Sequence, residues 1–144
     1  MKAYFSFYRP VLLAILFVAS LSACKKNNSD PAPDLASRVA GTYSYSELVA
    51  GGQTYPASQT DLKGTMKVTR QSATTVSIVV DFRIKSTNEV FLQDSADDVT
   101  VVDAGSGSIE YRLNGNLIAK GTTSKLSITG EDDNGVELTL SATK

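Results

Sequence analysis

Two acidic stretches are the first places where residue type and spacing suggest chemistry. One holds Asp94, Asp97, Asp98 and Asp103, and the other is the Glu-Asp-Asp-Asn-Gly run at 131–135. Calcium takes about six to eight oxygen ligands, which carboxylate-rich loops can supply. Neither stretch has the spacing of an EF-hand loop with its distant glutamate. Because Asp and Asn also favour turns through their own hydrogen bonds, we interpret both stretches as solvated turns and predict no metal site.

The composition gives other catalytic chemistries little support. The chain has no histidine, so it lacks the usual general base near neutral pH and the commonest zinc ligand. The Gly-Ser-Gly stretch at 105–107 has neither the lysine nor the helix start that a phosphate-binding loop requires. Glycoside hydrolysis needs two convergent carboxyl groups, and no pair stands out. We therefore predict a non-enzymatic protein without a cofactor, with a small carboxylate hydrolase as the less favoured alternative.

The single cysteine lies in a local sequence that points to lipid attachment. Cys24 ends the stretch Leu21-Ser22-Ala23-Cys24, which follows Lys2, Arg9 and an apolar run at 11–19. A charged start, a short apolar run and small residues before a cleavage site are typical of a secretory leader. The run is shorter than the roughly 20 apolar residues that span a bilayer. The four-residue stretch resembles the lipobox of bacterial lipoproteins; an ordinary leader with an unrelated or free thiol is the alternative.

The lipobox resemblance implies how the chain is processed and where it resides. Residues 1–23 would be a signal peptide with a helical core, and Cys24 would carry a diacylglyceryl group and an acylated amino terminus, with fatty acids such as palmitate. Several acyl chains anchor a protein stably, whereas one chain is marginal. Lys25 follows the cysteine where an aspartate would signal inner-membrane retention. The resemblance therefore implies the outer membrane of a Gram-negative bacterium, on its periplasmic or its outer face.

Residues 24–37 are polar, contain proline and lack apolar periodicity, which predicts a lipidated flexible tether. Removal of residues 1–23 takes away two basic and no acidic residues, so the net charge changes from −1 to −3. A mildly acidic chain lacks the basic field that nucleic-acid binding requires. Residues 38–144 are long enough for one hydrophobic core, so we predict a single domain there.

Alternation of apolar and polar residues dominates residues 38–144 and predicts eight or nine antiparallel strands without a helix. Hairpin turns are expected at Gly51-Gly52, Asn114-Gly115 and Asn134-Gly135, and a connection between strands at 94–98. The apolar face of such a meander is buried by closure into a barrel or by stacking as a β-sandwich. The strongest strand, 75–85, places five apolar residues on one face: Val76, Ile78, Val80, Phe82 and Ile84.

The element Gly41-Thr42-Tyr43 is similar to the Gly-x-Trp element that opens the first strand of lipocalin-like domains, with Tyr43 in place of tryptophan. The chain is more similar to the compact lipocalin-like domains of small bacterial lipoproteins. The resemblance implies an up-and-down barrel with a cup for an apolar or amphipathic small molecule. By alternation, the cup would be lined by Tyr43, Tyr45, Met66, Val68, Ile78, Val80, Phe82, Tyr111 and Leu126. Alternatively these side chains fill the core, as is common in small barrels.

Together these features predict a membrane-anchored extracytoplasmic lipoprotein whose lipocalin-like barrel binds a small apolar ligand. The alternative is a β-sandwich interaction module that binds a protein or a glycan in the cell envelope. A ligand-binding barrel requires an internal cavity of about 300 Å³ or more. A surface module instead has a filled interior and an exposed aromatic patch. The sequence leaves the oligomeric state open.

Overall fold

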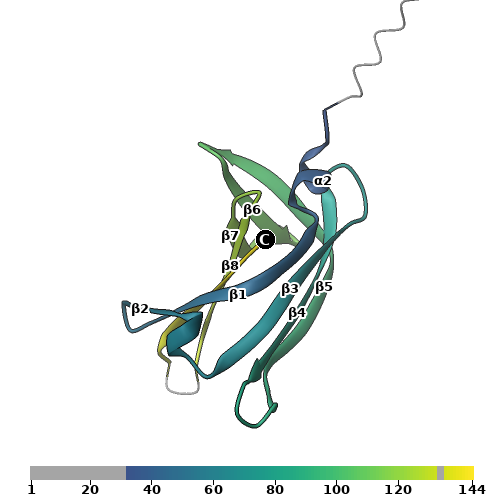
Figure 1. Cartoon of the computed structure of the whole chain (residues 1–144). Coiled ribbons are helices and arrows are strands. Elements are labelled where there is room, and N and C mark those ends of the chain that lie inside the picture. The colour runs from purple at the N-terminus through teal and green to yellow at the C-terminus, as the bar shows by residue number, and fades with distance from the viewer. Residues whose placement is uncertain (1–31, 133–134) are drawn as a thin grey trace, which may run out of the picture. The chain divides into compact units, whose positions relative to one another are not determined.

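A computed structural model describes residues 32–132 and 135–144 (Figure 1). Residues 33–144 form one compact unit. The predicted leader, Cys24 and Asn134 of the predicted Asn134-Gly135 turn lie outside the described residues. No helix in the described part is both long and apolar enough to cross a membrane. The core runs from Ala36 to Ala142, so residues 33–144 contain a complete core of the kind that lets a domain fold on its own.

Nine antiparallel strands make up the described part of the sheet, and eight of them close into a barrel (Figure 1). Each strand from β3 to β8 pairs with the next, β1 pairs with β3 and β9, and β2 forms a hairpin with the end of β1. This closure confirms the predicted antiparallel barrel and excludes the β-sandwich. The strands are β1 Gly41–Ala50, β2 Gln53–Pro56, β3 Leu62–Arg70, β4 Thr75–Ile84, β5 Val90–Gly105, β6 Ser108–Leu113, β7 Asn116–Gly121, β8 Lys125–Glu131 and β9 Glu137–Thr143.

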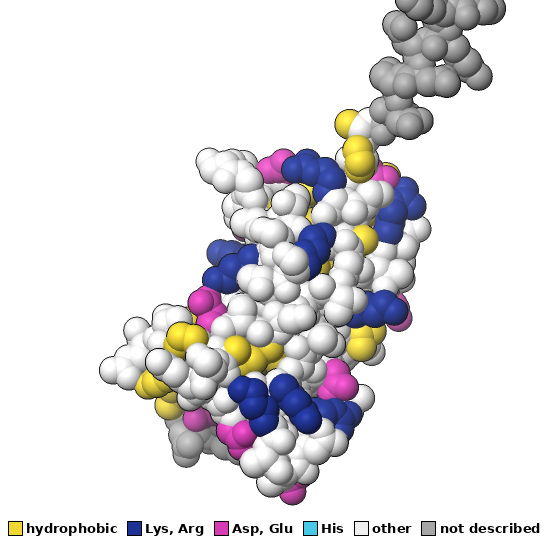
Figure 2. All heavy atoms as spheres, in the orientation of Figure 1, with side chains coloured by type: hydrophobic (Ala, Val, Ile, Leu, Met, Phe, Trp, Pro, Cys, Tyr) yellow, Lys and Arg dark blue, Asp and Glu magenta, His cyan; other side chains and the backbone are white. Residues whose placement is uncertain are grey.

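Strand β4 has the predicted register. Val76, Ile78, Val80 and Phe82 point inward and are buried, whereas Val79 is exposed on the outer face. The strand pairs with β3 without interruption from Leu62↔Ile84 to Arg70↔Val76. On the outer face in view, Figure 2 shows basic and acidic side chains interspersed. The barrel is therefore apolar inside and largely polar outside, as expected for an antiparallel sheet with one face in water.

Backbone angles confirm two of the predicted hairpin turns. Asn114 and Gly115 have φ of +52° and +84°, and Gly51 and Gly52 have φ of +56° and +78°. Positive φ at both central residues is the signature of a type I′ turn. The Gly51-Gly52 turn leads into the short strand β2. This strand ends at Pro56 on the edge of the sheet, where a missing N–H is tolerated.

Strand β5 is longer than expected, and the predicted connection at 94–98 is wrong. These residues continue the ladder with β4, in which Val80 pairs with Asp94 and Ile78 with Ala96. Leu92 and Ala96 pack against the core, and the exposed Asp side chains stay in water. Packing therefore outweighs the low strand propensity of aspartate. The register shifts between Val76 and Ile78, which is a bulge that takes up one extra residue of β5.

Helix α2 (Leu35–Val39) differs from the expectation of a tether through residue 37 and of no helix in the folded part. The Asp34 carboxylate caps it by accepting a hydrogen bond from the Ser37 N–H at 2.7 Å. Ala36 and Val39 are fully buried, and α2 covers one end of the barrel (Figure 1). One turn of helix gives almost no periodic signal, and burial of these two side chains stabilises it. A second short helix, η1 (Ala57–Gln59), precedes β3.

Lys144 fastens the other end of α2 to the barrel. Its ammonium group donates hydrogen bonds to the carbonyl oxygens of Arg38 at 3.0 Å and Ala40 at 2.9 Å. The same group lies 5.0 Å from the centre of the Tyr43 ring, which is a cation–π distance. These contacts place the Gly41-Thr42-Tyr43 element at the end of the barrel that α2 covers.

Candidate functional site

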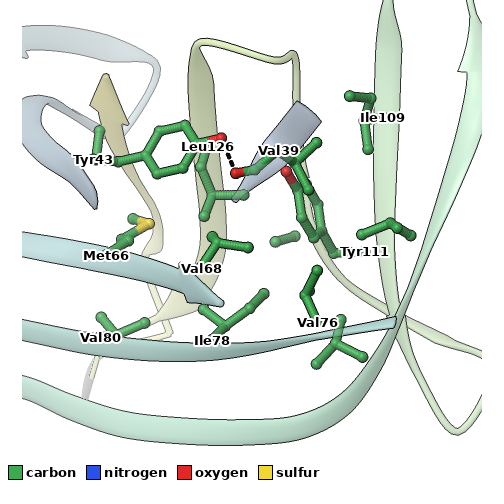
Figure 3. Close-up of a cluster of buried hydrophobic side chains, with 14 of the residues drawn as sticks. Val39, Tyr43, Met66, Val68, Val76, Ile78, Val80, Ile109, Tyr111 and Leu126 are labelled. Atoms are coloured by element: carbon green, nitrogen blue, oxygen red, sulfur yellow. Dashed lines mark hydrogen bonds between the residues drawn. The ribbon is translucent and has the colours of Figure 1, made fainter. Parts of the chain in front are cut away.

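The barrel is packed solid at the α2 end and along β3. Met66, Phe82 and Leu126 are fully buried there, and Tyr43 and Tyr111 lie beside Val39 of α2 (Figure 3). The Tyr43 hydroxyl donates a hydrogen bond to the Val39 carbonyl at 2.7 Å. Burial raises the pKa of both tyrosine hydroxyls. This half of the interior leaves no room for a ligand around these side chains.

The opposite half is open at the side because the β6–β7 hairpin is short. Strand β5 pairs with β4 from Val90 to Thr100 but with β6 only from Thr100 to Gly105. Strands β7 and β8 pair only at Lys120↔Ser127 and Gly121↔Leu126. Within the described part of the chain, one edge of β5 therefore has no strand partner at residues 90–98. The edge of β8 that faces it has none at residues 128–131. We call this gap beyond the hairpin tip the side opening.

Two adjoining cavities lie behind the side opening. The outer cavity has a volume of about 440 Å³, and the inner cavity has a volume of about 260 Å³. They share Leu92 of β5 and Ile128 of β8, so the two spaces meet between these strands. The outer volume exceeds the lower bound of about 300 Å³ for small-molecule sites. The barrel is thus packed at the α2 end and hollowed beside the side opening.

Apolar side chains form most of both cavity walls. The outer cavity is lined by Phe91, Leu92, Ile128, Thr129, Gly130, Glu131, Asp132, Leu138 and Leu140. The inner cavity is lined by Ile78, Val80, Leu92, Asp94, Ser95, Ala96, Leu113, Ile118, Ala119 and Ile128. Such a lining suits an apolar molecule, and its few polar groups are those that could orient one.

Asp94 is the charged residue of the inner cavity wall. It pairs with Val80 across the β4–β5 ladder, and Val80 points into the barrel, so Asp94 is on the inward face of β5. One of its carboxylate oxygens accepts a hydrogen bond from the Ser95 N–H at 2.7 Å. The side chain is nevertheless exposed, because the side opening leaves that part of the wall uncovered.

A third hollow, which we call the β7–β8 groove, lies along strands β7 and β8 next to the side opening. It has a volume of about 360 Å³ and includes Leu117 of β7 and Thr129 of β8. The groove shares Ile118 and Ala119 with the inner cavity. The groove and the inner cavity therefore adjoin each other at these two residues of β7.

The structure places two of the nine predicted lining residues, Ile78 and Val80, on a cavity wall. Tyr45 is half-buried outside both cavity walls, with its hydroxyl 3.0 Å from the Thr60 hydroxyl and its ring edge-on to Phe82. The remaining residues are buried in the packed core: Tyr43, Met66, Val68, Phe82, Tyr111 and Leu126. Contact of any of the nine with a ligand stays a prediction.

The alternation of apolar and polar side chains within single strands did not predict most of the residues that line the cavities. Leu113 and Ile128 continue the apolar alternation of β6 and β8, so the sequence does contain a signal for them. Ile118 lies at a register shift between β6 and β7, which alternation cannot predict. Asp94 stands between Leu92 and Ala96. Because aspartate is rare in strands, the sequence around it was predicted to be a connection between strands.

Four ion pairs join charged groups elsewhere in the described structure. Arg70 holds the pKa of Asp34 well below its ordinary range, and Lys125 lowers the pKa of Glu47. Both carboxylates lie outside the cavity walls. Within residues 32–132 and 135–144, no three His, Cys, Asp or Glu side chains are grouped as a metal site would require.

Comparison with known proteins shows similarity at the level of architecture. No protein-family model matches the sequence, and no curated protein matches it significantly. The structure is similar to that of a Bacteroides fragilis protein proposed to be an outer membrane protein, with a TM-score of 0.47 and 16% identity over 78% of this chain and 53% of that one. This chain therefore spans about half the length of that protein.

Two redesigned β-barrels are similar as well. The barrel b11L5F_LGL matches with a TM-score of 0.46 and 19% identity, over 76% of this chain and 93% of that one. The barrel mFAP1, bound to the small molecule DFHBI, matches with a TM-score of 0.43 and 16% identity, over 76% of this chain and 97% of that one. These three TM-scores are below 0.5, so the similarities carry no argument about function.

Proposed function

We propose that this protein is a non-enzymatic, lipid-anchored lipoprotein of the outer membrane whose barrel binds a small apolar ligand in the two cavities. The observation that supports ligand binding is the pair of adjoining apolar cavities that meet at Leu92 and Ile128. A packed barrel of this size needs no such space, and transfer of apolar ligand surface into it is favourable by roughly 25 cal/mol per Å².

A cavity-filling substitution tests this proposal. Residues 33–144 would be titrated with decanol, and binding would be followed by calorimetry. Ile128→Trp places a large side chain where the two cavities meet, so it is expected to weaken binding at least tenfold while the barrel stays folded. Val102→Trp on the outer face of β5, where Val102 is 39% exposed, is the matched control and should leave binding unchanged. Absence of decanol binding to the unsubstituted barrel would refute the proposed function.

Anchoring is proposed from the lipobox resemblance at Leu21-Ser22-Ala23-Cys24. In the full chain, Cys24→Ala is expected to move the protein from the membrane fraction to the soluble extracytoplasmic fraction or to leave it uncleaved in the inner membrane. Metabolic labelling with an alkyne fatty acid should mark the original chain and not the variant. Unchanged labelling of the variant would contradict lipid attachment at Cys24.

A further inference from the structure

We infer that the cavities select an apolar ligand that carries a positively charged amine, and that Asp94 is the residue that recognises the amine. This inference rests on the proposed ligand binding and adds the chemical class of the ligand. It depends on which charged groups line the cavities, on the inward position of Asp94 and on the way the side opening exposes it.

The charged side chains on the two cavity walls are all acidic. Asp94 lines the inner cavity, and Glu131 and Asp132 line the outer one. Neither wall contains a lysine or an arginine from the residues that the structure describes. A bound fatty acid or other anion would therefore place its charge near these carboxylates without a cation to pair with it, which is unfavourable.

Asp94 is also the group that an amine could reach. It lies on the inward face of β5 between Leu92 and Ala96, which both line the inner cavity. The Ser95 N–H occupies one carboxylate oxygen, and carboxylates have about four lone-pair sites, so acceptor capacity remains for a ligand. No ion pair joins Asp94 to another described side chain.

The side opening sets where the amine would lie. Residues 90–98 of β5 form one border of the opening, so Asp94 lies where the apolar interior meets water. A ligand can then bury its apolar body against Ile78, Val80 and Ile128 while its ammonium group stays hydrated beside Asp94. This arrangement avoids the cost of full desolvation of the charge pair.

Three probes of equal chain length separate charge from apolar contact: decylamine, decanol and decanoate, each below its aggregation concentration. Calorimetry on residues 33–144 is expected to rank decylamine first and decanoate last. Asp94→Asn should weaken decylamine roughly tenfold, as expected for a hydrogen bond to a charged group, and leave decanol unchanged. Asp103→Asn removes the same charge about 30 Å along β5, outside both walls, and should leave all three affinities unchanged.

The outcomes distinguish this inference from the proposed function. Equal binding of decylamine and decanol, or an Asp94→Asn variant that binds decylamine as well as the unsubstituted barrel does, would overturn the role of Asp94 and leave apolar binding intact. Loss of decylamine and decanol binding together in Asp94→Asn would also overturn it, because the substitution would then act on the cavity as a whole. If none of the three probes binds the unsubstituted barrel, the proposed function itself fails.

Discussion

The guanidinium group of Arg70 lies 2.8 Å from the carboxylate of Asp34, and this ion pair joins helix α2 to the end of β3. The same carboxylate caps α2 through the Ser37 N–H. One side chain thus fixes the start of the helix and its position over the barrel. Because α2 covers the packed end, this contact belongs to the half of the protein that lies away from the cavities.

Asp34→Asn is expected to lower the melting temperature at pH 7, because it weakens the cap and removes the ion pair. Arg70 and the Ser37 N–H hold the pKa of Asp34 below its ordinary value. Its stabilisation is therefore fully present above about pH 4 and is lost as the pH falls further. The difference between the two proteins in thermal scans should shrink below pH 4. Glu137→Gln, at an exposed carboxylate of β9, is the control and should change the melting temperature little.

Tyr43 and Tyr111 are two buried tyrosines whose hydroxyl groups differ in hydrogen bonding. Both rings are fully buried, but the Tyr43 hydroxyl bonds the Val39 carbonyl, whereas the Tyr111 hydroxyl has no hydrogen-bond partner among the described residues. Tyr43→Phe is expected to lower the free energy of unfolding by about 1 kcal/mol. Tyr111→Phe should be neutral or stabilising, since it removes an unpaired polar group. Urea unfolding of the two variants checks this, and a larger loss for Tyr111→Phe would contradict the geometry.

Burial of the same hydroxyls makes the barrel sensitive to alkali. Because burial raises the pKa of Tyr111 in the folded state, ionisation of this hydroxyl favours the unfolded chain above the ordinary tyrosine pKa of about 10 and has no effect on stability well below it. The urea midpoint should therefore fall as the pH rises from 10 to 12. Tyr111→Phe is expected to lessen this fall. An identical pH profile for the variant and the unsubstituted barrel would show that folding does not raise the pKa of Tyr111.

The strand pattern was predictable where side-chain alternation and turn chemistry agree. Strand β4 alternates throughout, and a slip of one residue would move its whole apolar face into water, so its register followed from the sequence. Asn114-Gly115 tolerates positive φ at both positions and defined its hairpin. Helix α2 was not predictable in this way, because its stability comes from tertiary burial of Ala36 and Val39.

The acidic stretch of β5 shows why the candidate site was harder to predict. Residues 90–98 have no strand partner on the side of the short β6–β7 hairpin, so this part of β5 is an edge. Inward-facing charges and bulges protect exposed edges against pairing with other chains. Asp94 faces inward, and Asp98 has a φ of +56° at the bulge. The aspartates are evident in the sequence. That they border an opening follows only from the difference in length between β5 and the β6–β7 hairpin, which the structure shows.

Gly64→Ala tests whether the close approach of β4 to β3 requires a glycine at position 64. A Cβ atom at Gly64 would overlap the Asp81 carbonyl oxygen and lie 2.6 Å from the Phe82 ring. The substitution is therefore expected to lower the free energy of unfolding by about 1–3 kcal/mol, the usual cost of overpacking. Gly130→Ala is the control, because a Cβ atom there meets nothing within 4 Å, and it should be neutral or slightly stabilising. Chemical denaturation gives both values, and equal costs would mean that backbone freedom, and not the close approach of β4, requires glycine at position 64.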